Sequence, residues 1–153
     1  MYLFTTYVSV NNEEREELLF QSVESNDLET IEALLRLNTD IDAREPEHNE
    51  TCLMQAIRHG HCDIAKWFLD KGSNLTAANV FESTAVHLAS EIDNLECLQD
   101  LVSFDADINM TDAWGYTPLD IAKYKDKRTT YSYLASIGAK CRACCNRRFG
   151  VPC

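Results

Sequence analysis

The sequence predicts an all-α solenoid in which four helix–turn–helix repeats are connected by β-hairpin loops. Three similar segments begin at Thr51, Thr84 and Thr117, and the interval between neighbouring segments is the same. Apolar positions follow the same shift, so that Leu101 corresponds to Phe68. The 153 residues are 45% hydrophobic and 25% charged, which are ordinary values for a globular protein. A period of about 33 residues indicates repeats that bury their apolar faces by stacking on one another.

The first helix of each unit is expected to begin directly after the threonine. A threonine hydroxyl is a good N-cap, and each of the three precedes an apolar pattern with helical spacing. Pro118 occupies the first helical position of the last unit, where its missing N–H costs nothing. Gly60 follows the first helix of the unit that begins at Thr51, and we expect it to end that helix.

The second helix of each unit is indicated by a further apolar pattern. Ile64, Ala65, Phe68 and Leu69 recur at helical spacing, and Gly72 follows them as the expected end of the helix. One such helix pair cannot bury its apolar face alone, whereas four stacked pairs can.

A looser copy of the unit lies upstream, and its offset is one residue longer than the period of the other three. Residues 26–29 match residues 60–63, and residues 34–35 match residues 68–69. Acidic residues at the entry to its first helix suit the positive end of the helix dipole. These acidic residues are Glu13, Glu14, Glu16 and Glu17.

The period sets the expected boundaries of the chain. We expect an N-terminal extension at 1–12, repeat 1 at 13–46, repeat 2 at 47–79, repeat 3 at 80–112, repeat 4 at 113–140 and a Cys/Arg-rich tail at 141–153. Repeats 1 and 4 are expected to act as caps, because the outer faces of terminal repeats meet solvent.

Residues 112–120 read Asp-Ala-Trp-Gly-Tyr-Thr-Pro-Leu-Asp, and shorter matches occur at 84–87, 60–61 and 72–75. These segments resemble the ankyrin repeat family over about residues 14–139. The resemblance implies that a histidine three residues after the threonine bonds its hydroxyl and links adjacent repeats. Only His87 is expected to keep this role.

The sequence departs from the family pattern at several places. Met54 and Asp120 stand where the neighbouring repeats would carry the linking histidine. The glycine of the hairpin is replaced by Asn49 and Glu82 and survives only as Gly115. We therefore expect a less regular array of modest stability.

The charge is unevenly distributed along the chain. Residues 1–122 carry 6 basic and 24 acidic residues, a net charge of −18, and residues 123–153 carry 8 basic residues and 1 acidic residue, a net charge of +7. The acidic body would repel a phosphate backbone, so we expect no nucleic-acid partner. The basic end could attract an acidic surface.

No catalytic constellation is found in the sequence. It contains neither a glycine-rich phosphate loop nor a nucleophile elbow, so we expect no enzyme, no catalytic residue, no cofactor and no metal site. Residues 59–62, His-Gly-His-Cys, could suggest a metal site, but they are better explained as the turn between two helices. Cys52 and Cys97 fall on core-facing positions and are interpreted as small buried hydrophobic residues.

The tail leaves three interpretations open. Cys141, Cys144, Cys145 and Cys153 could be inert thiols of a disordered terminus, or zinc ligands that start from the spacing Cys-x-x-Cys. The third interpretation is S-acylation of Cys144 and Cys145 next to arginines, which together would anchor the chain to a membrane.

The resemblance implies that specificity lies at the hairpin tips and on the concave face formed with the first helices. Phe81 and Trp114 are separated by one full period and occupy the same tip position in adjacent repeats, as an aromatic anchor pair would. The predicted partner-binding residues are His48, Arg58, His59, Val80, Phe81, Glu91, Ile92, Ala113, Trp114, Tyr116, Tyr124 and Lys125.

The expected function is a non-enzymatic protein–protein interaction module that acts as an inhibitor or an adaptor. The alternative is an S-acylated or zinc-stabilised adaptor that acts through its C-terminal tail. We expect a monomer that binds another protein and contacts a membrane only through the tail. Because no secretory signal is recognised, we expect a cytoplasmic location with access to the nucleus.

Overall fold

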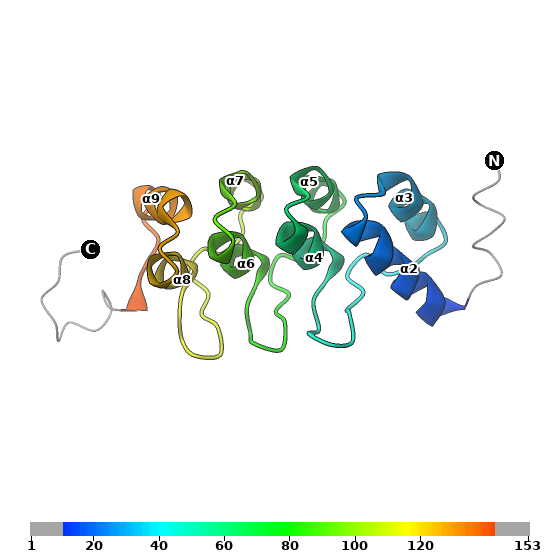
Figure 1. Ribbon diagram of the computed structural model, residues 1–153, viewed down its shortest axis with the longest axis horizontal. Coiled ribbons are helices and arrows are strands. Elements are labelled where there is room, and N and C mark those ends of the chain that lie inside the picture. The colour runs from blue at the N-terminus through cyan, green and yellow to red at the C-terminus, as the bar shows by residue number, and fades with distance from the viewer. Residues whose placement is uncertain (1–10, 143–153) are drawn as a thin grey trace, which may run out of the picture. The chain divides into compact units, whose positions relative to one another are not determined.

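The computed structural model describes residues 11–142, and within this range the chain is built from pairs of α-helices (Figure 1). The helices are α2 (Asn12–Glu24), α3 (Leu28–Arg36), α4 (Cys52–His59), α5 (Cys62–Asp70), α6 (Ala85–Glu91), α7 (Leu95–Ser103), α8 (Pro118–Tyr124) and α9 (Arg128–Ser136). They fall into two compact units, the first ending at Asn74 and the second beginning at Leu75. The predicted all-α repeat fold is confirmed.

The first helices of the three regular repeats begin where the threonines predicted. Thr51 and Thr117 accept hydrogen bonds from the backbone N–H three residues later, and Thr84 precedes α6 in the same extended conformation. Pro118 is in the first turn of α8. In α2 the cap is Asn11, which forms a reciprocal capping box with Glu14, so one of the four predicted entry glutamates has a specific partner.

Backbone φ is positive at the same three positions of each repeat. The turn after the first helix uses Asn26, Gly60, Asp93 and Asp126, the turn after the second helix uses Asn38, Gly72, Asp105 and Gly138, and the hairpin uses Asn49, Glu82 and Gly115. The predicted turn glycines are therefore confirmed. Asparagine and aspartate tolerate this region, whereas a glutamate is unusual there.

The first unit packs α2 against α3 and α4, and α4 against α5. Its core is made of fully buried side chains from all four helices, which are Leu19, Ile31, Leu34, Leu53, Met54, Ile57, Ile64 and Phe68. The periodic apolar positions predicted from the sequence therefore form this core.

The second unit packs α6 against α7 and α8, and α9 against α8 and α7. Its core is formed by Val86, Leu88, Ala89, Leu98, Leu101, Ala122 and Leu134. The loop from α7 to α8 reverses direction beyond the helices, as Figure 1 shows. Within residues 11–142, β-pairing is limited to an isolated antiparallel bridge between Arg44 and Thr51, so the hairpin loops are tight turns rather than paired strands.

Candidate functional site

The two hairpin tips of the second unit are built by a polar residue at their base. Asn79 Oδ1 accepts hydrogen bonds from the N–H groups of Phe81 at 2.9 Å and Ser83 at 3.0 Å. Asp112 Oδ1 accepts equivalent bonds from Trp114 at 3.0 Å and Tyr116 at 2.8 Å. Neither Asn79 nor Asp112 was among the functional residues predicted from the sequence, although the two are separated by the same period as the threonines. These bonds hold each tip in a fixed turn.

The tips carry exposed apolar side chains that contact one another. The rings of Phe81 and Trp114 stack with centroids 5.8 Å apart and an interplanar angle of 22°. They remain 43% and 59% exposed, and Val80 and Tyr116 beside them are also exposed. Ala113, another exposed tip residue, donates its N–H to Phe81 O at 3.0 Å, so the backbones of the two hairpins are joined as well.

Arg142 extends this surface, although the sequence analysis placed it in the tail. Its backbone N–H donates to the Asp120 carboxylate, with 2.8 Å to Oδ2, and its Nη1 donates to Trp114 O at 2.9 Å. The guanidinium carbon lies 5.4 Å from the centroid of the Tyr116 ring, within the range of a cation–π contact. We call the group of Val80, Phe81, Trp114, Tyr116 and Arg142 the tip surface.

His87 forms hydrogen bonds that connect the start of α6 to the backbone of Tyr116 in the tip surface. Its Nδ1 accepts from the Thr84 N–H at 3.1 Å and lies 2.9 Å from Thr84 Oγ1. Nε2 must therefore carry the proton, and it donates to Tyr116 O at 3.2 Å. Burial lowers the pKa of His87, which favours the neutral ring that this arrangement requires. The linking role predicted for His87 is confirmed within this unit.

The other predicted contacts of the second unit lie where the first helices end. Glu91 closes α6 and forms an ion pair with Lys125, which follows α8. Ile92 and Tyr124 are exposed beside them. Because each charge is already paired with the other, these two side chains offer less to a partner than the tip surface does.

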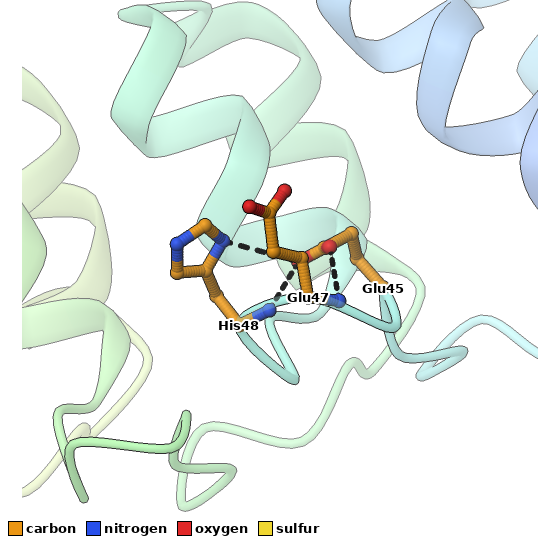
Figure 2. A group of neighbouring side chains, drawn as sticks. All are labelled: Glu45, Glu47 and His48. Carbon is orange, nitrogen blue, oxygen red and sulfur yellow. Dashed lines mark hydrogen bonds and ion pairs between the residues drawn. The ribbon is translucent and has the colours of Figure 1, made fainter.

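In the first unit, predicted residue His48 belongs to a small cluster with Glu45 and Glu47, drawn in Figure 2. Glu45 accepts hydrogen bonds from the backbone N–H groups of Glu47 and His48, the latter at 2.9 Å. The Glu45 carboxylate therefore accepts backbone N–H groups of its own turn, as the side chains of Asn79 and Asp112 do at the hairpin tips of the second unit. These bonds explain the cluster as a turn, and nothing in it points to a cation.

Arg58, which is predicted to bind a partner, already forms hydrogen bonds to a buried carboxylate within the fold. Its guanidinium makes two hydrogen bonds to Glu50, one of them from Nε at 3.0 Å, and Glu50 is only 2% exposed. A buried carboxylate needs such a partner, so Arg58 serves the fold as well as any surface. His59 is exposed and stacks on His61 with centroids 6.0 Å apart.

His61, Cys52 and Cys97 fit the structural roles that the sequence predicts for them. His61 Nε2 lies 3.1 Å from Glu24 O, which ties the turn to the preceding helix pair. Cys52 and Cys97 are buried, and burial raises the pKa of the Cys52 thiol, so it is held in the protonated form. Cys141 is buried as well, and the other three tail cysteines lie outside the described residues.

Comparisons with known proteins place the chain in a family. A family model described as "Ankyrin repeats (3 copies)" matches residues 2–79, and a second, "Ankyrin repeats (many copies)", matches residues 86–126. The chain belongs to the ankyrin repeat family. The resemblance seen in the sequence is thereby confirmed.

Several ankyrin relatives are similar over much of this chain. Protein fem-1 homolog A-like from Mus musculus is 34% identical over 57% of this chain, but the match spans only 13% of that protein. Protein phosphatase 1 regulatory subunit 27 from Homo sapiens is 31% identical over 68% of this chain and 67% of its own length. Ankyrin repeat domain-containing protein 37 from Bos taurus is 26% identical over 63% of this chain and 61% of its own length.

The hydrogen bonds of Asp120 correct the expectation that only His87 keeps the linking role of this ankyrin position. Asp120 replaces the linking histidine, yet its Oδ2 accepts from Thr117 N at 3.1 Å and from Thr117 Oγ1 at 2.9 Å. The same carboxylate accepts from the N–H of Arg142, so it links the last ankyrin repeat to the segment that follows. The carboxylate thus does what His87 does, because both side chains present an acceptor three residues after the cap.

Ankyrin repeats typically serve as non-enzymatic modules for protein–protein interaction, and this chain contains such repeats over residues 2–79 and 86–126. None of the described helices combines the length and the apolar character needed to cross a bilayer.

Proposed function

We propose that this ankyrin protein binds a partner protein through the tip surface and acts as an inhibitor or an adaptor. The observation that carries the proposal is the stacked pair of Phe81 and Trp114, which stays exposed while both hairpins are held rigid. Rigid aromatic side chains that lose little entropy on binding are typical interface anchors.

The surroundings of the pair support this role. Val80 and Tyr116 widen the apolar area, and Arg142 adds a cation at its edge. Interface cores are enriched in aromatic residues and arginine, and this composition matches the tip surface. The predicted contacts at Glu91, Ile92, Tyr124 and Lys125 form the second part of the proposed interface. For the first unit we separately propose that His48, Arg58 and His59 contact a partner.

A regulatory role is favoured by one relative. Protein phosphatase 1 regulatory subunit 27 is named as a regulatory subunit, and it shares 31% identity with this chain over 105 residues. We therefore include the catalytic subunit of protein phosphatase 1 among the partners to be tested. We propose that the chain is monomeric and acts in the cytoplasm or the nucleus.

The competing proposal is an adaptor that works through its tail. It rests on Cys144 and Cys145, which lie outside the described residues, and on their neighbouring arginines. If the tail carries the function, replacing both cysteines with serine abolishes localisation of the protein. If the tip surface carries it, the same replacement leaves partner binding intact.

The test is a quantitative capture experiment with the full chain as bait. Wild type is compared with Phe81→Ala, Trp114→Ala, in cytosolic extract and with purified protein phosphatase 1 catalytic subunit. The matched control is Leu28→Ala, Ile137→Ala, because these two residues are also exposed and apolar but lie away from the tips. Circular dichroism checks that the three proteins fold equally.

A partner captured by wild type and control, but at least about tenfold less by the tip variant, supports the proposal, since two hot-spot truncations cost this much or more. Equal capture by all three proteins contradicts it and moves attention to the tail.

A further inference from the structure

A second surface of the last repeat stands out by its charge and shape. An open pocket of about 250 Å³ lies at the turn between α8 and α9. It is lined by Ala122, Lys123, Asp126, Lys127, Arg128 and Tyr131. None of these residues belongs to the tip surface or to the predicted partner-binding set.

The residues that line this pocket include three cations and one anion, so the net charge of the lining is +2. Arg128 Nε lies 3.6 Å from Asp126 Oδ1, but the two side chains are 87% and 83% exposed, so water weakens this pair. Lys123 forms no ion pair with any residue between 11 and 142, whereas the charge of Lys127 also acts on the Asp93 carboxylate and helps to lower its pKa. Lys123 and Arg128 are therefore the cationic groups of the pocket that are most available to an anionic ligand.

The N-terminus of α9 is not the source of this site. The backbone N–H of Thr130 already donates to Asp93 Oδ1 at 2.9 Å, so part of the positive end of the helix is neutralised. The anion attraction of the pocket therefore comes from its lysine and arginine side chains.

The rest of the second unit limits what kind of anion can approach. Residues 75–142 contain 10 acidic and 6 basic residues, and four of the basic residues fall within positions 123–128. An extended polyanion such as a nucleic acid or a membrane surface would also meet the acidic remainder and be repelled. A short anionic group meets only the basic turn.

We propose that this pocket, which we call the basic pocket, binds a phosphorylated serine of a partner protein. A phosphoserine carries a charge of about −1.5 to −2 at neutral pH, which balances the local +2. Its compact oxygen cluster suits an opening lined by lysines and an arginine, which donate to phosphate oxygens. This inference does not depend on the tip surface, and either proposal can fail without the other.

The experiment measures fluorescence anisotropy of a labelled eight-residue peptide with one central phosphoserine flanked by uncharged residues. Its unphosphorylated form, inorganic phosphate, phosphatidylserine vesicles and single-stranded RNA serve as the comparison probes. Wild type is compared with Lys123→Gln, Arg128→Gln. The control is Lys71→Gln, Lys140→Gln, which removes the same net charge from exposed lysines outside the pocket.

The proposal expects the phosphopeptide to bind more tightly than its unphosphorylated form. It also expects the pocket variant to weaken that binding about tenfold, since two partly exposed charge pairs are lost. The control is expected to match wild type, and the affinity is expected to fall with added salt. Equal weakening by both variants, or no preference for the phosphopeptide, overturns the proposal. Tighter binding of vesicles or RNA with the same dependence on Lys123 and Arg128 also overturns it.

Wild type alone provides a second test, which covers the case of a pocket variant that does not fold. The phosphopeptide is titrated into ¹⁵N-labelled protein, and the amide signals of residues 122–131 must shift first. Shifts confined to other residues contradict the proposal.

Discussion

Asp93 and Thr130 belong to neighbouring repeats, and the Asp93 carboxylate caps the helix that contains Thr130. Asp93 Oδ1 accepts from Thr130 N at 2.9 Å and from Thr130 Oγ1 at 3.0 Å. Partial burial acts to raise the pKa of Asp93, but these bonds, with the Thr129 hydroxyl and the charge of Lys127, outweigh it and lower the pKa. The turn of one repeat thus stabilises the second helix of the next.

Replacing Asp93 with glycine is expected to destabilise the chain by about 1 kcal/mol, as the loss of a helix cap usually does. Glycine keeps the positive φ of 60°, so the loss reports the missing carboxylate. Asp126 has the same turn position and a φ of 52°, but within residues 11–142 its carboxylate caps no helix of a following repeat. Asp126→Gly is therefore the control, and urea unfolding followed by circular dichroism should show no loss for it.

Glu82→Gly is expected to stabilise the chain. Glu82 has a φ of 56°, at the hairpin position that Asn49 and Gly115 occupy in the neighbouring repeats. A residue with a Cβ in the left-handed region carries about 1–2 kcal/mol of backbone strain, which glycine removes. Part of this stabilisation is offset because glycine makes the unfolded chain more flexible. The net gain should be about 0.5–1 kcal/mol. Glu82→Ala keeps the Cβ and should not show it, and an equal gain for both variants would point to charge rather than backbone strain.

Gln55→Leu is expected to raise the free energy of unfolding. Gln55 is 8% exposed, and its Oε1 has no hydrogen-bond partner among the described residues. Leu88 and Ile121 stand at the same position of the next two repeats. Removing an unsatisfied buried amide should stabilise the chain by about 1–2 kcal/mol. Gln99→Leu, on the exposed face of α7, is the control, and no difference between the two variants in thermal unfolding would contradict this account.

His87→Gln should change how stability depends on pH. Because burial lowers the pKa of His87, the unfolded chain takes up the proton at a higher pH than the folded chain does. The contribution of His87 is therefore fully present above the unfolded pKa of about 6.5 and is lost as the pH falls through the folded pKa. Wild type should lose stability as the pH falls from 7.5 to 5.5, a range that spans the unfolded pKa of about 6.5.

The Gln variant should be less stable at neutral pH by about 1–3 kcal/mol, the cost of leaving buried polar groups unpaired, and should show a flatter pH dependence. Urea unfolding at several pH values checks both statements. The exposed His59→Gln variant should keep the wild-type profile, and the same flattening in that variant would assign the effect to another group.

Much of the fold could be predicted because its signals are local. Thr51 and Thr117 cap helices through bonds that span three residues, and Gly60 and Gly72 adopt the positive φ that the turns after the helices require. The sequence also showed that Phe81 and Trp114 share one tip position. Whether their rings stack and stay exposed depends on the packing of adjacent repeats.

What could not be predicted depends on contacts between positions far apart in the chain. Arg58 was expected only to face a partner, but it also neutralises Glu50, because a carboxylate that is buried requires a nearby cation. Arg142 was assigned to the tail, but its backbone N–H donates to the Asp120 carboxylate and its guanidinium donates to Trp114 O of the last hairpin.

The sequence by itself determined the period, the helix caps, the left-handed turns and the membership of the ankyrin family, since these follow from residue types at fixed spacing. Only the tertiary structure decided which polar side chains bridge neighbouring repeats and which apolar ones remain exposed. The capping of α9 by Asp93, for example, requires the two helix pairs of the second unit to pack first. Burial and partner geometry are properties of the packed units, and no spacing along the chain specifies them.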